Sequence, residues 1–164
     1  MLEIAIETPD QAAVRALLEA GDAYMAALYP PESNHMLDLE ALTKPEVAFF
    51  VARSDGLVVG CAAMVNSGDG WAEIKRMFVA PAARGQQVGR KLLLEIETTA
   101  AQRGLTVLRL ETGIKQPQAL ALYRSAGYRD IGPFGPYALD PLSLFMEKSV
   151  VGASPPNPSG GDRS

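Results

Sequence analysis

The sequence has few of the residues that build disulfides, metal clusters and cationic surfaces. It contains a single cysteine and a single histidine, which excludes an internal disulfide and a zinc site of the Cys/His type. Its 19 acidic residues outnumber the 15 lysines and arginines, and the net charge of −4 argues against a nucleic-acid-binding domain. Cys61 lies inside the apolar run from Leu57 to Val65, so we predict a buried, inert thiol.

Long apolar runs and a leader-like start are missing as well. No apolar run approaches the roughly 20 residues that span a bilayer, and the first residues lack a basic region followed by an apolar core. We therefore expect a cytoplasmic protein that binds no membrane. With 164 residues, 48% of them hydrophobic, the chain has room for one core, which predicts a single domain over residues 1–150. Glycine, proline and serine dominate after that and predict a disordered tail over 151–164.

The periodicity of the apolar residues predicts an alternation of strands and helices. Seven apolar or alternating runs indicate strands at 2–6, 47–53, 57–65, 71–79, 106–112, 128–130 and 144–148. Helical spacing indicates helices at 10–28, 36–42, 87–103 and 117–127. A tight-turn signal, Ser54-Asp55-Gly56, makes a hairpin of the second and third strands. Strands first, then a strand-helix-strand-helix block, predict an α/β chain with a mixed sheet flanked by helices.

The segment from Val79 to Lys91 is the most informative part of the chain. It combines the end of a strand at Pro81, a turn of small residues and glycines, and the start of a helix. The unpaired N–H groups and the positive dipole end of such a helix bind anions. Five cationic residues and no acidic one lie between Lys75 and Lys91, so the expected ligand is a phosphate or pyrophosphate. An ordinary helix cap is the alternative.

This segment resembles the acyl-CoA-binding signature of the GNAT superfamily of N-acetyltransferases, Gln/Arg-x-x-Gly-x-Gly/Ala. Arg84, Val88 and Gly89 fit the signature, whereas Gln87 stands where the family most often has glycine. A glutamine at positive φ carries a steric cost. We therefore expect Gly85 to supply the flexibility and Gln87 to be helical already.

Two further stretches resemble the same superfamily. Residues 72–79 look like its fourth strand, which carries the pantetheine arm of the cofactor and often a glutamate near its start. Residues 119–128 look like its Asn-x-x-Ala-x-x-x-Tyr helix with a Gly-Phe/Tyr ending, and Gln116 replaces the asparagine. The resemblance covers residues 47–149, and the first 46 residues match in pattern only.

The resemblance implies a GNAT fold with a mostly antiparallel central sheet, and a reaction without a metal. Acetyl-CoA would be the cosubstrate and would enter between the strands at 73–79 and 106–112. Direct attack in a ternary complex is favoured over an acyl-enzyme, because Cys61 lies in the wrong strand. The residues expected to bind the cofactor are Met77, Phe78, Val79, Arg84, Gly85, Gln86, Gln87, Val88, Gly89, Arg90 and Gln116.

Tyr123 and Glu73 are the candidate catalytic residues. The resemblance places Tyr123 near the cofactor sulfur, where a hydrogen bond to the leaving thiolate is its expected contribution, because a phenol is a weaker acid than a thiol. Packing alone is the alternative role. Glu73 is the candidate general base, acting through water on the acceptor nitrogen. Its alternative is an exposed strand glutamate paired with Lys75, since residues two apart in a strand point the same way.

The acceptor site is expected in loops, where the family varies most. Arg76 and Lys75 are candidates for contacts to phosphate or acceptor, and a solvated strand face is the alternative. The residues predicted to contact the acceptor are Tyr29, Ser33, Asn34, His35 and Tyr137. A surface loop histidine is the alternative for His35.

The predicted function is transfer of an acetyl group to the primary amine of a small molecule. Two alternatives stay open. One is an enzyme that acetylates peptide N-termini or lysines. The other is an acyl-CoA-binding regulatory module that has lost turnover, which the substituted Gln87 and Gln116 permit. A homodimer also stays open as the assembly.

Overall fold

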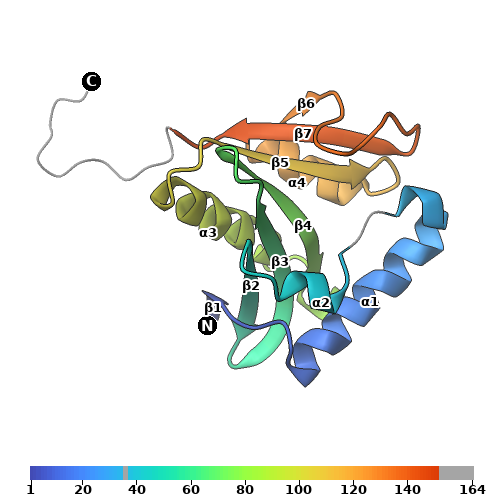
Figure 1. The fold of residues 1–164 in the computed structure, drawn as a ribbon. Helices are drawn as coiled ribbons and strands as arrows, with labels where there is room; N and C mark the ends of the chain where they lie inside the picture. Colours follow the sequence, from blue (N-terminus) through green and yellow to red (C-terminus); the bar gives the residue numbers. More distant parts are fainter. Residues whose placement is uncertain (35–36, 152–164) are drawn as a thin grey trace, which may run out of the picture.

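The computed structural model describes residues 1–34 and 37–151, which form a twisted seven-stranded sheet with helices on both faces (Figure 1). The strands are β1 (Leu2–Ile6), β2 (Val47–Ser54), β3 (Leu57–Asn66), β4 (Trp71–Val79), β5 (Val107–Gly113), β6 (Arg129–Ile131) and β7 (Ser143–Ser149). The helices are α1 (Ala12–Leu28), α2 (Leu39–Leu42), α3 (Val88–Gln102) and α4 (Pro117–Ser125), with short 3-10 turns at Pro31–Ser33 (η1) and Pro81–Ala83 (η2). Each predicted strand lies within one residue of its predicted ends.

The sheet order is β1-β2-β3-β4-β5-β7-β6, and β4 with β5 is the parallel pair in an otherwise antiparallel sheet. This confirms the predicted mixed, mostly antiparallel sheet. The predicted helix at 36–42 covers only Leu39–Leu42 among the described residues, where Asp38 caps it by accepting from the Ala41 N–H. No helix within residues 1–34 and 37–151 is long and apolar enough to cross a bilayer.

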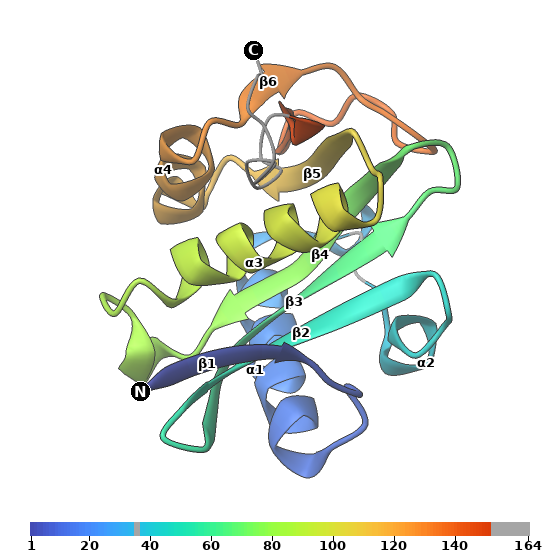
Figure 2. The same cartoon turned by 90° about the vertical axis from the view of Figure 1, so that its left-hand side faces the viewer.

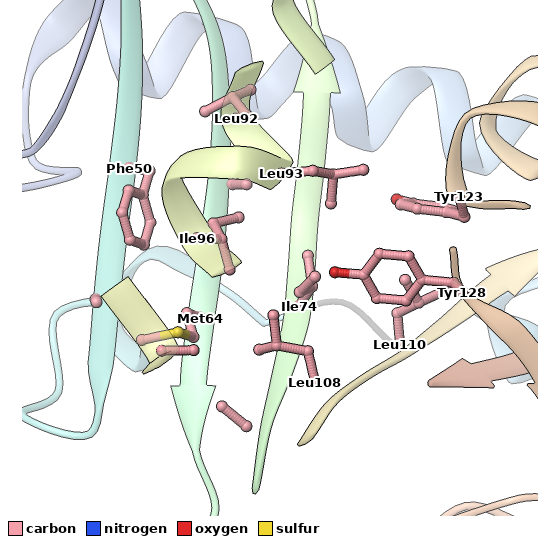
Figure 3. Packing of buried hydrophobic residues seen from close by; sticks show 14 of the residues in the cluster. Phe50, Met64, Ile74, Leu92, Leu93, Ile96, Leu108, Leu110, Tyr123 and Tyr128 are labelled. Atoms are coloured by element: carbon pink, nitrogen blue, oxygen red, sulfur yellow. The ribbon is translucent and has the colours of Figure 1, made fainter. Parts of the chain in front are cut away.

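Two apolar cores lie on opposite faces of the sheet. On one face, α3 buries Leu92, Leu93 and Ile96 against residues of β2–β5, including Ile74 and Leu108 (Figure 3). On the other face, α1 and α2 cover β2 and β3; Figure 2 shows α1 behind the sheet and α3 in front of it. Each fully buried side chain of this size contributes on the order of 1.5–3 kcal/mol, so the two cores hold both layers of helices on the sheet.

Cys61 belongs to the second core. It is fully buried, and burial raises the pKa of its thiol to about 12. Its Sγ–H donates to the carbonyl of Arg76 at 3.4 Å. The predicted buried thiol is therefore confirmed, and its raised pKa suppresses the reactive thiolate.

An irregularity in β4 shapes the centre of the sheet. The pairing of β3 with β4 shifts register between Cys61 and Ala63, and Arg76 on the opposite strand has a φ of +59°. Before this bulge the even-numbered Ile74 packs into the core under α3. After it the odd-numbered Met77 packs there, so the bulge shifts the inward-facing positions of β4 by one residue. β4 also pairs with β5 only as far as Ile74 opposite Leu110. The two strands then diverge towards the start of α3 (Figure 2).

Arg76 is held by α1. Its guanidinium, with the side chain only 5% exposed, donates to Oδ1 of Asp22 at 2.6 Å and to the carbonyl of Leu18 at 3.2 Å. A solvated strand face is therefore wrong for this residue. Both contacts fix α1 against the bulge, and Arg76 also lines the smaller of the two cavities of the site.

Candidate active site

A groove of about 660 Å³ opens where β4 and β5 diverge, between the end of β4 and the first turns of α3 and α4. It is lined by all but one of the residues predicted to bind the cofactor. Those that line it are Met77, Phe78, Val79, Arg84, Gly85, Gln87, Val88, Gly89, Arg90 and Gln116. The exception is Gln86, which is exposed and does not line the groove.

The loop before α3 turns through two residues with left-handed backbone. Gly85 has a φ of +88°, as the flexibility predicted for it requires, and Gln87 has a φ of +64°. The prediction that Gln87 is already helical is therefore wrong: Gln87 is the N-cap, and the helix begins at Val88. A glutamine in this conformation costs on the order of 1–2 kcal/mol relative to ordinary backbone. Gln87 thus has the left-handed backbone that glycine adopts easily, although it is a glutamine.

The start of α3 is left open to a ligand. Gln87 makes no side-chain capping hydrogen bond, and the first turn carries no acidic residue. The leading N–H groups of a helix have no partner within the helix, and here the first residues of α3, Val88, Gly89 and Arg90, line the groove. Arg84 lies beside them, 5.6 Å from the ring centroids of both Tyr24 and Phe78. This arrangement suits a phosphate or pyrophosphate.

A second, smaller cavity of about 110 Å³ continues from the groove towards α1, η1 and the end of β5. We call it the inner pocket. Five residues line both spaces: Tyr24, Met77, Phe78, Gln116 and Tyr123. The two cavities therefore form one site, with Tyr123 and Met77 at the junction.

Tyr123 is buried at this junction, with 7% of its surface exposed. Its hydroxyl donates to Sδ of Met77 at 3.7 Å, and its ring meets the edge of Tyr128 at a centroid distance of 6.0 Å (Figure 3). Burial raises the pKa of Tyr123 to about 12. The phenol therefore stays protonated at neutral pH and is available as a hydrogen-bond donor.

Glu73 lies in the inner pocket and is not exposed, because only 13% of its side chain is accessible. Oε2 accepts from the hydroxyl of Tyr137 at 2.6 Å and lies 3.4 Å from Nζ of Lys75. The pairing with Lys75 matches the sequence, but an exposed strand glutamate is wrong. Burial raises the pKa of Glu73, and the Lys75 charge and the Tyr137 hydrogen bond oppose that rise. A carboxylate with a raised pKa is a stronger base than an ordinary glutamate.

Two of the residues predicted to contact the acceptor line the inner pocket, Tyr29 and Ser33. The hydroxyl of Tyr29 accepts from the backbone N–H of Lys115 at 3.0 Å and reaches Oε1 of Gln116 at 3.4 Å. Ser33 donates to Oδ2 of Asp140 at 2.7 Å, which ties η1 to the segment before β7. These bonds tie the end of α1 and η1 to the segments that follow β5 and precede β7.

Two further predicted acceptor contacts, Tyr137 and Asn34, are not among the residues that line the pocket. Tyr137 bonds to Glu73 and Lys75 from behind the pocket. Asn34 does not line the pocket, and its buried Oδ1 finds no partner within the described part of the chain. His35 lies outside the described residues.

Sequence reasoning missed the contribution of β5 to the inner pocket. Glu111, Thr112 and Gly113 line it, together with Ser143 of β7, whose hydroxyl donates to Glu111 at 2.8 Å. The signal was present in the strand itself. Glu111 follows the buried Leu108 and Leu110 in alternation, so it had to face the other side of the sheet, where Glu73 also points.

Gly113 leaves the space that Tyr29 occupies. A Cβ at this position would lie 1.8 Å from the Tyr29 hydroxyl oxygen. Gly113→Ala is therefore expected to lower the free energy of unfolding by about 1–3 kcal/mol, the usual cost of overpacking. Urea denaturation measures it. Gly132→Ala is the control, because its Cβ would meet nothing within 4 Å. Equal losses in both variants would contradict the packing of Tyr29 against Gly113.

The chain is similar to known acetyltransferases in sequence and in fold. The model of the acetyltransferase (GNAT) family matches residues 13–128. The chain is 56% identical to the IAA acetyltransferase of Azospirillum brasilense over 148 residues, which cover 90% of this chain and 97% of that one. A crystal structure from Klebsiella pneumoniae, assigned as an acyl-CoA N-acyltransferase, superposes with a TM-score of 0.78 at 41% identity and covers 92% of this chain and 98% of that one. The PaiA N-acetyltransferase of Thermoplasma acidophilum, solved with coenzyme A, shares the fold with a TM-score of 0.71 at 18% identity, over 91% and 99% of the chains.

Proposed function

The chain belongs to the GNAT family of N-acetyltransferases, which use acyl-CoA, and from this premise we propose that it moves the acetyl group of acetyl-CoA to the amine of a small molecule. One observation carries the proposal. The groove at the start of α3 and the inner pocket meet at Tyr123 and Met77. A thioester lying in the groove and an amine in the pocket would therefore meet at that junction.

The residues of the groove fit the two ends of the cosubstrate. The uncapped start of α3, with Gly85 and Gln87 in left-handed backbone, would hold the pyrophosphate. Residues 75–79 of β4, beyond the pairing with β5, would carry the pantetheine arm along their free edge. When bound, the cosubstrate supplies the activated acetyl group, and the chain supplies orientation and proton transfer.

Two side chains would handle the protons of the reaction. The acceptor nitrogen attacks the thioester carbon, the new C–N bond forms, and the C–S bond breaks. Glu73 takes the proton released from the nitrogen, directly or through water, and its raised pKa suits that step. Tyr123 donates a hydrogen bond to the sulfur as the thiolate leaves. Cys61 takes no part, since it is buried in the other core.

The inner pocket favours a small acceptor over a peptide. Its volume of about 110 Å³ is a sixth of that of the groove, and the Ser33–Asp140 hydrogen bond joins its two walls. A peptide acceptor would need an open channel for the rest of its chain beyond the reacting amine. A regulatory module without turnover is disfavoured, because both candidate catalytic side chains line the pocket.

Release of the free thiol from acetyl-CoA, followed across a panel of acceptors, tests the proposal. The panel includes IAA, the compound that the Azospirillum relative is named for, amino acids, polyamines and a short peptide. We expect a small acceptor to raise thiol release well above the acceptor-free rate. Turnover only with the peptide would favour the protein-modifying alternative, and tight acetyl-CoA binding without any turnover would favour the regulatory module.

Tyr123→Phe is expected to lower kcat by about tenfold to a hundredfold, the usual effect of removing one hydrogen bond to a developing charge. The affinity for acetyl-CoA, measured by calorimetry, should change little, because the ring still fills the junction. Tyr128→Phe is the matched control, since its hydroxyl bonds to Glu97 and lies away from the cavities. A loss of affinity without a fall in kcat would make Tyr123 a packing residue.

A further inference from the structure

The hydrogen-bond network behind Glu73 contains a residue that the sheet does not supply. Tyr137 lies in the loop between β6 and β7, 64 residues from Glu73. Its hydroxyl donates to Oε2 of Glu73 at 2.6 Å and accepts from Nζ of Lys75 at 2.5 Å. Lys75 also approaches the same oxygen, at 3.4 Å. One carboxylate oxygen is thus fixed by two partners that also bond to each other.

The second oxygen of Glu73 is free to act. Oε1 accepts no hydrogen bond from a described residue, and it is not among the buried unsatisfied atoms of the described chain. Since Glu73 lines the inner pocket and Oε1 is not a fully buried atom, Oε1 is the oxygen left available to a group bound there. The network therefore fixes Oε2 and leaves Oε1 for the acceptor.

The ring of Tyr137 is itself fixed by aromatic packing. It meets Phe134 at a centroid distance of 5.2 Å, edge to face, and Phe145 of β7 at 5.7 Å. Phe134 packs in turn against Trp71 at the start of β4, at 5.5 Å. Contacts of this geometry favour one ring orientation. The hydroxyl is consequently in place before any substrate binds.

Within residues 1–34 and 37–151, the titratable groups around Glu73 come from three segments. Lys75 lies on the same strand, Arg109 and Glu111 lie on β5, and Tyr137 comes from the loop. Arg109 is bonded to Glu147 and stacked on Trp71, so its charge is already compensated. Burial and Glu111 raise the pKa of Glu73, whereas Lys75 and Tyr137 lower it. The pKa of Tyr137 is raised by its burial and by Glu73, so the phenol remains the donor.

We propose that Tyr137 is the positioning residue of the general base: its hydroxyl, backed by Lys75, fixes Oε2 of Glu73 and presents Oε1 to the acceptor. The inference rests on the proposed function, in which Glu73 takes the proton. It assigns Tyr137 a role distinct from the acceptor contact that the sequence suggested. The hydroxyl also keeps the buried carboxylate ionised, because a hydrogen bond to the charged form favours that form.

Carbon-13 NMR titration of the Glu73 carboxyl group in the wild type and in Tyr137→Phe tests the proposal, with Glu73→Gln to assign the signal. The phenyl ring keeps the aromatic packing and loses only the hydroxyl. We expect the pKa of Glu73 to rise by about one unit in the variant. The acidic limb of the kcat profile should move to higher pH by the same amount, at unchanged acetyl-CoA affinity. Tyr128→Phe, which removes a hydroxyl from Glu97 instead, should leave the Glu73 titration where it was.

The outcomes distinguish the positioning role of Tyr137 from the role of Glu73 as the base. An unmoved Glu73 titration in Tyr137→Phe would overturn the positioning role, and a higher KM for the acceptor alongside it would make Tyr137 an acceptor contact. A titration that moves while the acidic limb of kcat stays in place would support the hold of Tyr137 on Glu73. An acidic limb that does not move with the pKa of Glu73 would overturn the role of Glu73 as the base, which is part of the proposed function.

Discussion

Replacing Gly89 with glutamate is expected to abolish acetyl-CoA binding while the chain stays folded. Gly89 is in the first turn of α3 and lines the groove, so the new carboxylate would lie where the pyrophosphate meets the helix N–H groups. Two like charges about 4 Å apart repel by about 4 kcal/mol at an effective dielectric constant near 20. That is about a thousandfold loss of affinity. Calorimetric titration with acetyl-CoA measures it.

Any side chain at position 89 also meets a steric contact, so a control must separate the effect of that contact from the effect of the charge. A Cβ on Gly89 would lie 2.9 Å from Cδ2 of Leu122 on α4, so any side chain must displace the end of that leucine. Gly89→Ala has this contact without the charge and is the matched control. We expect alanine to reduce affinity far less than glutamate, with similar melting temperatures for both. Wild-type affinity in Gly89→Glu would show that no phosphate binds at the start of α3.

Glu73→Gln is expected to lower kcat at pH 7 by on the order of a hundredfold to ten-thousandfold, the usual contribution of a general base. A carboxylate acts as a base only when ionised. Because the pKa of Glu73 is raised, the wild-type rate should fall on acidification at a higher pH than an ordinary glutamate would allow. The variant should lose that acidic limb. It should recover partly at high pH, where more free amine is present and hydroxide replaces the base.

Profiles of kcat from about pH 4 to 10 test this expectation, because the window must include the range in which a glutamate titrates. Glu95→Gln is the control: that carboxylate is exposed on α3 and lines neither cavity. Its profile should follow the wild type. If the profiles of Glu73→Gln and the wild type superimpose after one constant factor, Glu73 takes no proton, and orientation with Tyr123 carries the reaction.

The order of the strands and helices was predictable from the sequence because apolar periodicity is local. Leu108 and Leu110 alternate along the strand and Leu92, Leu93 and Ile96 recur at helical spacing, and in the structure all five are buried in the core beneath α3. The groove was predictable for a similar reason. Most of its residues fall in two short stretches, from Met77 to Arg90 and from Gln116 to Tyr123, and short-range order already places the first stretch at one helix start.

The acceptor side was less predictable, since its parts come from distant segments. Tyr29, Glu73, Glu111 and Ser143 meet in one pocket from four different elements. Their association depends on the register of β4 with β5 and on the docking of α1, and neither is encoded in a local pattern. Tyr137 illustrates this: its loop is irregular, and only the aromatic cluster under it shows that the hydroxyl faces Glu73.

By itself the sequence determined the fold class, the strand limits and the glycine loop before α3, because each follows from periodicity, turn chemistry and helix-end physics over short stretches. Tertiary structure alone decided three things: the bulge at Arg76, the left-handed Gln87 and the hold of Tyr137 on Glu73. Backbone strain at Arg76 and Gln87 is unfavourable for the isolated segment. It persists because packing elsewhere, such as the bonds of Arg76 to α1, outweighs it, and that balance exists only in the folded chain.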